Sequence, residues 1–270
     1  GNSEGIFGYG YSDPAAHHSI TNLVSNAGVV ATDTTGVGTI RSALAATQYG
    51  GDKGIFGYGN TGSVSSLTNL VSNAGVVATD VTGVGTARKT LAACSYGDDK
   101  GIFGFGTTGS LTAVTNLVSN SGVVATDVTG VGTVREYLAA CEYGDDKAIF
   151  GYGHTGSDVV VSMTNLVSNA GVVATDTTGV GTTRGYLAAC SYGYDKGIFA
   201  YGNSGSYTAV SNLVSNVGVV ATDVTGVGTS RGYLAATQYG GDKGIFGFGT
   251  TGAQVGMTNL VSNAGVVATD

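Results

Sequence analysis

Hydrophobic and polar positions recur along this chain in a long, regular cycle. The string Gly-Ile-Phe-Gly-Tyr-Gly, with small variations, begins at six places that lie 47 or 49 residues apart. The copies start at Gly5, Gly54, Gly101, Ala148, Gly197 and Gly244. Between them run Thr-Asn-Leu-Val-Ser-Asn, Gly-Val-Val-Ala-Thr-Asp, Thr-Gly-Val-Gly-Thr-x-Arg and Leu-Ala-Ala-x-x-Tyr-Gly-x-Asp-Lys. Because nearly every residue belongs to a copy, residues 1–270 are predicted to form one domain.

Each copy has the pattern of four short strands. We name them segment A (residues 91–96 in one copy), B (101–105), C (67–72) and D (75–80), and Gly, Asn and Asp mark the turns between them. No stretch keeps a 3.6-residue period, so helices are expected to be rare. Four strands per copy at this period are typical of one blade of a β-propeller. The sequence therefore predicts an all-β, six-bladed β-propeller with mostly four-stranded antiparallel blades.

The side chains of segments A and B fit this arrangement. Segment A contains Leu-Ala-Ala, and small residues suit the strand nearest a tapering axis. In segment B, Phe56 and Tyr58 share one face, while Ile55 and Gly57 share the other. We expect the aromatic face to fill the space toward one neighbouring blade, and the glycine face to let the other neighbour approach closely.

The first blade is predicted to lack its own inner strand. The sequence begins at segment B of the first copy and stops after segment D of the sixth, at Asp270, which gives six copies of B, C and D but five of A. Three explanations stay open. The first blade has three strands, or the chain is a fragment, or another chain supplies the strand, which would make an oligomer.

Composition narrows the choice of partners. The chain has 48 Gly, 1 Pro and 42% hydrophobic residues, which argues against disorder and against collagen. The formal net charge of −7 disfavours nucleic acid, and no apolar run reaches the length of a membrane span. Three cysteines, Cys94, Cys141 and Cys190, occupy equivalent places in segment A. They are interpreted as small packing residues and not as a redox or disulfide set.

Motifs that resemble chemical sites have simpler interpretations. A Gly-x-Gly-x-x-Gly string begins at Gly57, but no predicted helix follows it, so no nucleotide or other cofactor is expected. His17 and His18 are adjacent, which makes them a poor chelating pair on a strand, and no metal site is predicted. Most acidic residues recur in every copy, whereas catalysis usually needs one asymmetric constellation. The chain is therefore not expected to be an enzyme, and a propeller glycosidase or oxidase is the less favoured alternative.

Two resemblances add to this prediction. An Arg, an apolar strand and then Asp-Lys-Gly-Ile-Phe-Gly-Tyr-Gly, as from Arg88 onward, resembles a kelch repeat over nearly the whole chain. Gly-Tyr-Gly stands where kelch repeats have a double glycine, and Val-Val-Ala-Thr-Asp replaces the strand that carries a Trp. The sequence Thr-Asn-Leu-Val-Ser-Asn followed by Gly-Val-Val-Ala-Thr-Asp is similar to repeats of phage and marine viral particle proteins. These resemblances imply a kelch-like ring on a virus particle or tail.

The repeat arginines allow two interpretations. Each lies eight residues after a framework aspartate, as Arg41 follows Asp33, so an Asp–Arg pair bracing each D–A loop is one of them. The resemblance to kelch-like rings implies the other, in which arginines that open segment A line the channel mouth and grip an acidic ligand. The arginines concerned are Arg41, Arg88, Arg135, Arg184 and Arg231.

Variation between copies gathers in the B–C loops and just after the repeat arginine. The B–C loops include Tyr11 to His18 in the first copy and a loop opening at His154 in the fourth, and Tyr137, Tyr186 and Tyr233 follow three of the arginines. In an up-and-down blade these positions converge on one face, where Tyr and Arg are favoured anchors for recognition. We predict a ligand site of the five arginines, these three tyrosines and His154; neutral drift in exposed loops is the alternative.

The predicted function is a non-enzymatic binding or structural module. On a virion or another extracellular surface it would recognise host carbohydrate or a neighbouring particle protein. The alternative is a purely structural disc in an assembly, which exposed apolar patches on the rim or at the open first blade would favour. An engineered repeat protein is also considered, although the irregular substitutions favour a natural one.

Overall fold

The computed structural model describes residues 4–12, 16–156 and 159–270, and in those residues the chain forms seventeen strands and no helix. The strands are β1 (Gly5–Ser12), β2 (Ala16–Val24), β3 (Ala45–Tyr49), β4 (Lys53–Gly57), β5 (Thr68–Val71), β6 (Ala92–Tyr96), β7 (Lys100–Gly104), β8 (Thr115–Val118), β9 (Ala139–Tyr143), β10 (Lys147–Gly151), β11 (Thr164–Val167), β12 (Ala188–Tyr192), β13 (Lys196–Ala200), β14 (Ser211–Val214), β15 (Ala235–Tyr239), β16 (Lys243–Gly247) and β17 (Thr258–Val261). The all-β prediction is confirmed. Within those ranges, no helix is long and apolar enough to cross a membrane.

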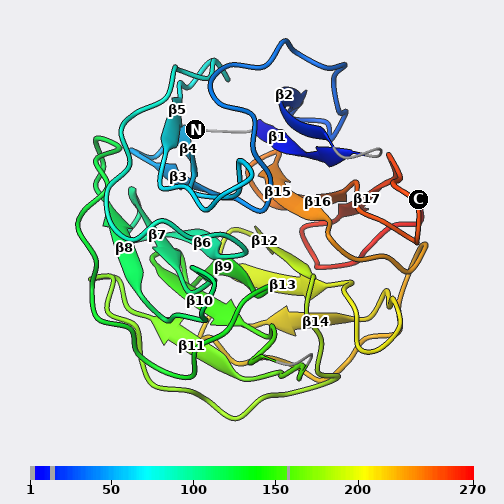
Figure 1. The fold of residues 1–270 in the computed structure, drawn as a ribbon. Helices are drawn as coiled ribbons and strands as arrows, with labels where there is room; N and C mark the ends of the chain where they lie inside the picture. Colours follow the sequence, from blue (N-terminus) through cyan, green and yellow to red (C-terminus); the bar gives the residue numbers. More distant parts are fainter. Residues whose placement is uncertain (1–3, 13–15, 157–158) are drawn as a thin grey trace.

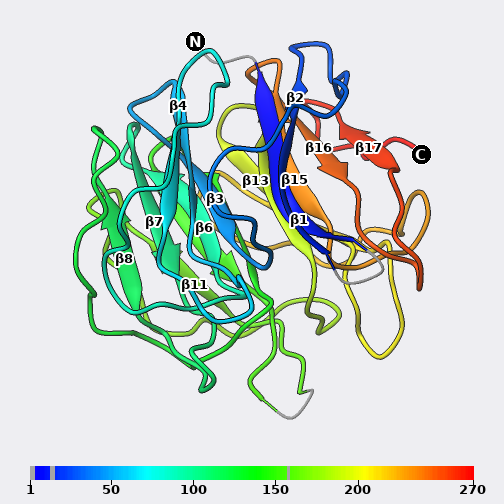
Figure 2. The same cartoon turned by 45° about the horizontal axis from the view of Figure 1, so that its top comes forward.

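Small antiparallel sheets follow one another around a common centre (Figure 1). The described strands make six sheets, five of them with three strands in the order inner, middle and outer, as in β3-β4-β5. The inner strands contact one another from β3 through β6, β9 and β12 to β15, and β1 contacts β15. Figure 2 shows the strands running across the thickness of the disc, so the loops gather on its two faces. The arrangement is propeller-like.

The turn between inner and middle strands forms where the sequence predicts it. Tyr96 of β6 pairs with Lys100 of β7, and three residues join them. Gly97 and Asp98 both have positive φ, 59° and 67°. Gly adopts this left-handed conformation without steric cost, and Asp tolerates it better than most residues do. The Gly-Asp cluster therefore closes a tight hairpin.

Segment D is not a regular fourth strand, and the prediction is corrected here. Its only pairings within the described residues are isolated bridges, such as Val71 with Val77 and Thr68 with Val81. The Asn69 side chain lies between the two segments and donates from Nδ2 to the Ala78 carbonyl (3.0 Å), where a ladder would place a backbone N–H. The bridged residues are three apart in β5, Thr68 and Val71, but four apart in the facing segment, Val77 and Val81. This extra residue is a bulge, and it prevents a continuous ladder.

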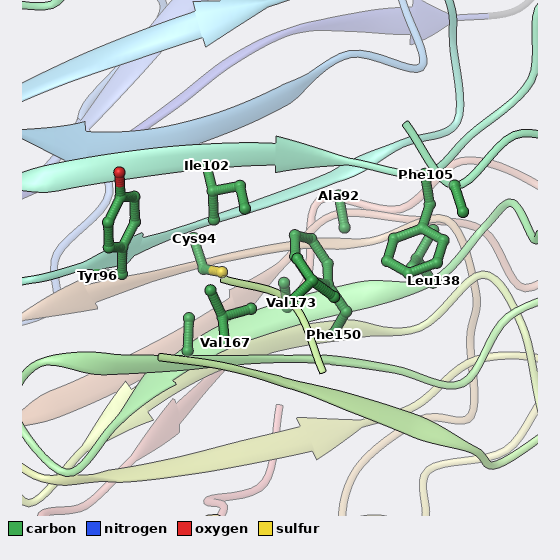
Figure 3. Packing of buried hydrophobic residues seen from close by; sticks show 12 residues of the cluster. Ala92, Cys94, Tyr96, Ile102, Phe105, Leu138, Phe150, Val167 and Val173 are labelled. Atoms are coloured by element: carbon green, nitrogen blue, oxygen red, sulfur yellow. The ribbon is translucent and has the colours of Figure 1, made fainter. Parts of the chain in front are cut away.

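The core lies between neighbouring sheets, as Figure 3 shows for one interface. Phe105, directly after β7, and Phe150 of β10 are fully buried, with ring centroids 5.2 Å apart in an edge-on arrangement. A Cβ on Gly104 would lie 2.8 Å from Phe150 Cζ, so the glycine leaves room for the ring of the next sheet.

The predicted glycine face is confirmed, but the predicted aromatic face is wrong. Phe56 lies 5.1 Å from Tyr9 of the preceding sheet, whereas Tyr58 lies 5.1 Å from Phe103 of the next sheet, on the same side as Gly57. The reason is the positive φ of Tyr58, 65°, which breaks the alternation of a regular strand.

The three cysteines are part of this packing. All are buried and unpaired by disulfides. Burial raises the pKa of the Cys94 thiol well above its usual value, which keeps it in the neutral form. Cys141 Sγ lies against Gly197 of the next sheet. These contacts are those of small apolar side chains.

The first sheet differs from the others. It contains β1 and β2, and in the described residues no inner strand pairs with β1. The two strands pair from Gly5–Val24 to Ser12–Ala16, with an irregularity between Gly8 and Gly10. The sequence predicts this missing inner strand.

Candidate functional site

The five repeat arginines lie inside the sheets and not at the channel mouth. Each is 0% exposed. Arg184 makes a full set of bonds: its Nε donates to the Tyr201 carbonyl (2.9 Å), Nη1 to the Thr182 carbonyl (3.0 Å) and Nη2 to Asn212 Oδ1 (2.7 Å). Its guanidinium therefore joins the ends of three segments of one sheet.

The same guanidiniums hold neighbouring sheets together. The Arg184 Cζ lies 4.3 Å from the centroid of the Tyr152 ring, which belongs to the preceding sheet. Equivalent stacking places Arg41 over Tyr9, Arg88 over Tyr58, Arg135 over Phe105 and Arg231 over Tyr201. A cation over an aromatic face is attracted by the ring quadrupole, more strongly when water is excluded. Each arginine thus contributes within its sheet and across one interface.

The arginine predictions need two corrections. Guanidiniums that are fully buried and already bonded cannot grip a ligand at the mouth, so Arg41, Arg88, Arg135, Arg184 and Arg231 are removed from the binding site. The other interpretation, an Asp–Arg pair that braces the structure, holds with a different aspartate. Arg41 Nη1 lies 3.7 Å from Asp80 Oδ1, and Asp80 takes the place predicted for Asp33. The reason is that Asp80 ends segment D of the sheet that Arg41 opens, whereas Asp33 belongs to the sheet before it.

The tyrosines stand two residues after the arginines, in a strained part of the backbone. Tyr137, Tyr186 and Tyr233 have φ values of 53°, 57° and 58°, and Ala43 and Thr90 occupy the same place in two other sheets with φ 52° and 56°. A positive φ in a bulky residue is a genuine outlier that the surroundings must hold in place.

Backbone hydrogen bonds hold these five positions in a row around the channel. From Thr90 onward, each N–H donates to the carbonyl of its counterpart in the preceding sheet, at 2.8–3.0 Å. The row runs from Ala43 through Thr90, Tyr137 and Tyr186 to Tyr233. The positions of these side chains are therefore fixed by the fold before any ligand arrives.

Three tyrosine rings and one imidazole form a cluster at this mouth. The Tyr186 ring centroid lies 4.1 Å from those of both Tyr137 and Tyr233, with tilts of 43° and 31°. His154, nearly buried, lies 4.7 Å from Tyr186. Tyr233 ends the stack and is 55% exposed. The structure thus brings together Tyr137, Tyr186, Tyr233 and His154, as the sequence predicts; we call these four residues the tyrosine platform.

The Tyr137 and Tyr233 hydroxyls are uncharged near neutral pH. Burial, and after it the nearby Glu136 carboxylate, raise the pKa of Tyr137 to about 12. The pKa of Tyr233 is also raised, first by burial and then by its interaction with Tyr186. The hydroxyls therefore stay protonated and can both donate and accept hydrogen bonds.

The variable loops gather at the same mouth. The position after each arginine bridges to the start of a B–C loop, as Glu136 does to His154 and Gly185 to Asn203. Parts of two B–C loops, residues 13–15 and 157–158, lie outside the described residues. His17 and His18 lie in β2, and His18 Nε2 lies 2.5 Å from Ser12 Oγ. The cluster is one-sided, because Ala43 and Thr90 stand where the other sheets have tyrosines.

Glu142 is a channel residue that the sequence analysis missed. A cavity of about 450 Å³ lies at the centre of the ring, and β9 places Glu142 in its wall. Burial raises the pKa of this carboxyl to about 7, although Ser95 Oγ donates to Glu142 Oε2 at 2.6 Å. The equivalent positions hold Gln48, Ser95, Ser191 and Gln238. A comparison of this position across the copies would have found Glu142, because it is a carboxyl where the other copies have Ser or Gln.

Glu142→Gln is expected to remove a pH dependence of stability. The folded-state pKa of about 7 lies above the ordinary 4.5, so the folded chain binds the proton more tightly, and stability falls as pH rises from 4.5 through 7. At about 1.4 kcal/mol per pKa unit, the loss reaches at most about 3 kcal/mol. Urea unfolding from pH 5 to 8 should show wild type falling relative to the variant. A constant difference across that range would contradict the raised pKa.

Comparison with known proteins shows the fold. No family model matches the sequence, and no curated protein matches it. Among solved structures, that of YjhT is similar, with a TM-score of 0.69 and 10% sequence identity over 93% of this chain and 90% of YjhT. At that identity the likeness concerns the arrangement of the strands alone, and it agrees with the propeller-like ring of sheets.

Proposed function

We propose that this chain is a non-enzymatic recognition module, a six-bladed, kelch-like propeller that binds a saccharide on the tyrosine platform. The observation that carries the proposal is the stack of Tyr137, Tyr186 and Tyr233, held at positive φ by a row of backbone hydrogen bonds. Strain of this kind clusters at binding sites, where it fixes side chains in advance.

The chemistry of the platform suits a neutral or weakly polar sugar. Exposed ring area on Tyr233 offers an apolar surface for the C–H face of a sugar, and protonated hydroxyls offer hydrogen bonds to its hydroxyl groups. Tyrosine supplies such contacts with little loss of conformational entropy. With the similarity of the repeats to viral particle proteins, this favours host-surface carbohydrate as the ligand and a virion or extracellular location.

A glycan-array screen tests this proposal. Wild type should bind a subset of glycans, and Tyr186→Thr should weaken that binding at least tenfold, because it removes the middle ring of the stack. Threonine is a suitable replacement, because Thr90 occupies the equivalent position in another sheet with the same backbone conformation. Tyr194→Gly is the matched control: Tyr194 is 71% exposed in a turn between inner and middle strands, where Gly51 and Gly241 stand in other copies. Glycan binding that is equal in all three proteins would contradict the platform as the site.

A second candidate, a structural disc, is favoured by a ring of exposed valines. One valine per copy, just after the C–D turn, is 62–65% exposed: Val29, Val76, Val123, Val172, Val219 and Val266. These turns adjoin the inner–middle turns, as Asn73 Nδ2 donates to Asp52 Oδ2 (3.2 Å), and so lie on the face opposite the platform. Periodic apolar exposure suits a contact with a neighbouring particle protein. A folded chain that binds no glycan would favour this candidate.

A further inference from the structure

One lysine of this acidic chain has no anionic partner. All five arginines are buried inside the sheets. Five of the six lysines pair with the aspartate that precedes them, as Lys100 Nζ does with Asp99 Oδ1 at 2.9 Å. Lys89 is the sixth, and no carboxylate in the described part of the chain forms an ion pair with it. With a net charge of −7, the chain thus keeps one lysine charge that its own carboxylates do not neutralise.

Lys89 lies at the mouth that carries the tyrosine platform. Its backbone pairs with Thr107, at the start of a B–C loop, through hydrogen bonds of 2.9 and 3.0 Å. The next residue, Thr90, accepts at its carbonyl the hydrogen bond from the Tyr137 N–H (2.9 Å). Lys89 is therefore one residue from the backbone partner of a platform tyrosine. Its flexible four-carbon stem lets the ammonium reach across the mouth.

A comparison with the next sheet explains why this lysine is unpaired. Glu136 holds the equivalent position there, and its Oε2 accepts from Thr90 Oγ1 of the preceding sheet (2.8 Å). The residue that stands in the place of Thr90 for Lys89 is Ala43, whose side chain can accept nothing. The other sheets with a repeat arginine have Ser42, Gly185 and Gly232 at the position of Lys89. The fold thus gives the ammonium no partner at this point.

The mouth changes in character from one sheet to the next along the row. The rings of the platform come first, and Tyr137 packs on Tyr186 of the following sheet. The Glu136 carboxylate follows, close enough to raise the pKa of Tyr137. The sheet before it contributes Lys89 and the short side chain of Thr90. A ligand that extends from the rings along the row therefore meets a hydrogen-bond acceptor and then a cation.

We propose that the saccharide bound on the tyrosine platform is acidic, with an uncharged sugar ring on the tyrosines and an adjoining carboxylate or sulfate group on the Lys89 ammonium. This inference rests on the proposed function, because it names the class of saccharide that the platform takes. A charge-assisted hydrogen bond is stronger than a neutral one. The Glu136 carboxylate accepts from hydroxyl groups of the ligand and repels a second negative group. The ligand is therefore a saccharide with one negative group beside an uncharged ring.

An array of matched glycan pairs tests this inference. The two members of each pair differ only in a terminal carboxylated sugar or in one sulfate group, so the two kinds of pair distinguish the two sources of the charge. Wild type should bind the acidic member of at least one pair about tenfold more tightly, and this preference should shrink as salt is added. Neutral members bound as well as their acidic partners would overturn the inference and leave the proposed function intact. Binding to no glycan would overturn both.

Three variants locate the charge. Lys89→Ser places there the residue that Ser42 provides in another sheet, and it should abolish the preference for acidic members while binding of neutral members persists. Lys89→Arg should keep the preference, because a guanidinium also donates to carboxylate and sulfate. Lys100→Ser is the matched control, since it removes the same charge from the same sheet on the opposite face. Melting curves check that all three variants fold.

Two results with these variants would overturn the assignment to Lys89. One is a preference for acidic glycans that survives in Lys89→Ser. The other is an equal loss of preference in Lys89→Ser and Lys100→Ser, since the cause would then be the net charge of the chain and not a contact at the mouth.

Discussion

Arg184→Ala should destabilise the protein by about 4 kcal/mol, because it removes a buried guanidinium that three acceptors and a ring depend on. Its loss leaves Asn212 Oδ1 and the Tyr201 carbonyl without their donor inside the sheet. Each unsatisfied buried group costs about 1–3 kcal/mol. The lost stacking on Tyr152 adds up to about 2 kcal/mol. Urea unfolding followed by circular dichroism measures the difference.

The matched control is a cation on the surface. Lys196 Nζ lies 2.6 Å from Asp195 Oδ1, but its side chain is 42% exposed. Exposed pairs contribute less than about 1 kcal/mol, so Lys196→Ala should change stability little. Equal effects of the two substitutions would contradict the bracing role of the buried arginines.

Phe199→Ala should cost about 3–5 kcal/mol, as expected for a large ring removed from a well-packed interior. The ring is fully buried and lies 5.1 Å from Tyr152, centroid to centroid. It also fills the space above Gly151, where a Cβ would come within 2.8 Å of Phe199 Cζ. The cavity left behind would lie between two sheets with three strands each, which can collapse only slightly. Thermal and urea unfolding both report this loss.

Phe7→Ala provides the comparison. Phe7 holds the same strand position in the two-stranded first sheet and lies 5.2 Å from Phe248. Because this sheet has no inner strand among the described residues, it can relax more, and the cost should be clearly smaller than for Phe199→Ala. A larger cost at Phe7 would contradict the account of the first sheet as the loosest part of the ring.

The strands could be predicted because the repeat supplies the same local signals many times. The Gly-Asp turn after Tyr96 and the small residues of segment A suffice to place inner and middle strands. Segment D could not be predicted correctly, because its bulge depends on Asn69 reaching the Ala78 carbonyl. A side chain that replaces a ladder bond leaves no mark in the pattern of hydrophobic positions.

The site shows a similar division. The tyrosine platform could be predicted because the variable positions follow the repeat arginines directly. The burial of those arginines could not, since Arg184 is covered by a ring, Tyr152, that comes from the sheet before it. Sequence spacing gave the wrong aspartate for the same reason: Arg41 meets Asp80 across a sheet and not Asp33 along the chain.

The most direct test of the central claim is a crystal structure of the chain with the best-binding saccharide from the array. The account predicts a sugar ring against the exposed face of Tyr233, with hydroxyl groups within hydrogen-bonding distance of the platform. A sugar bound instead on the opposite face, among the turns that carry the exposed valines, would contradict it.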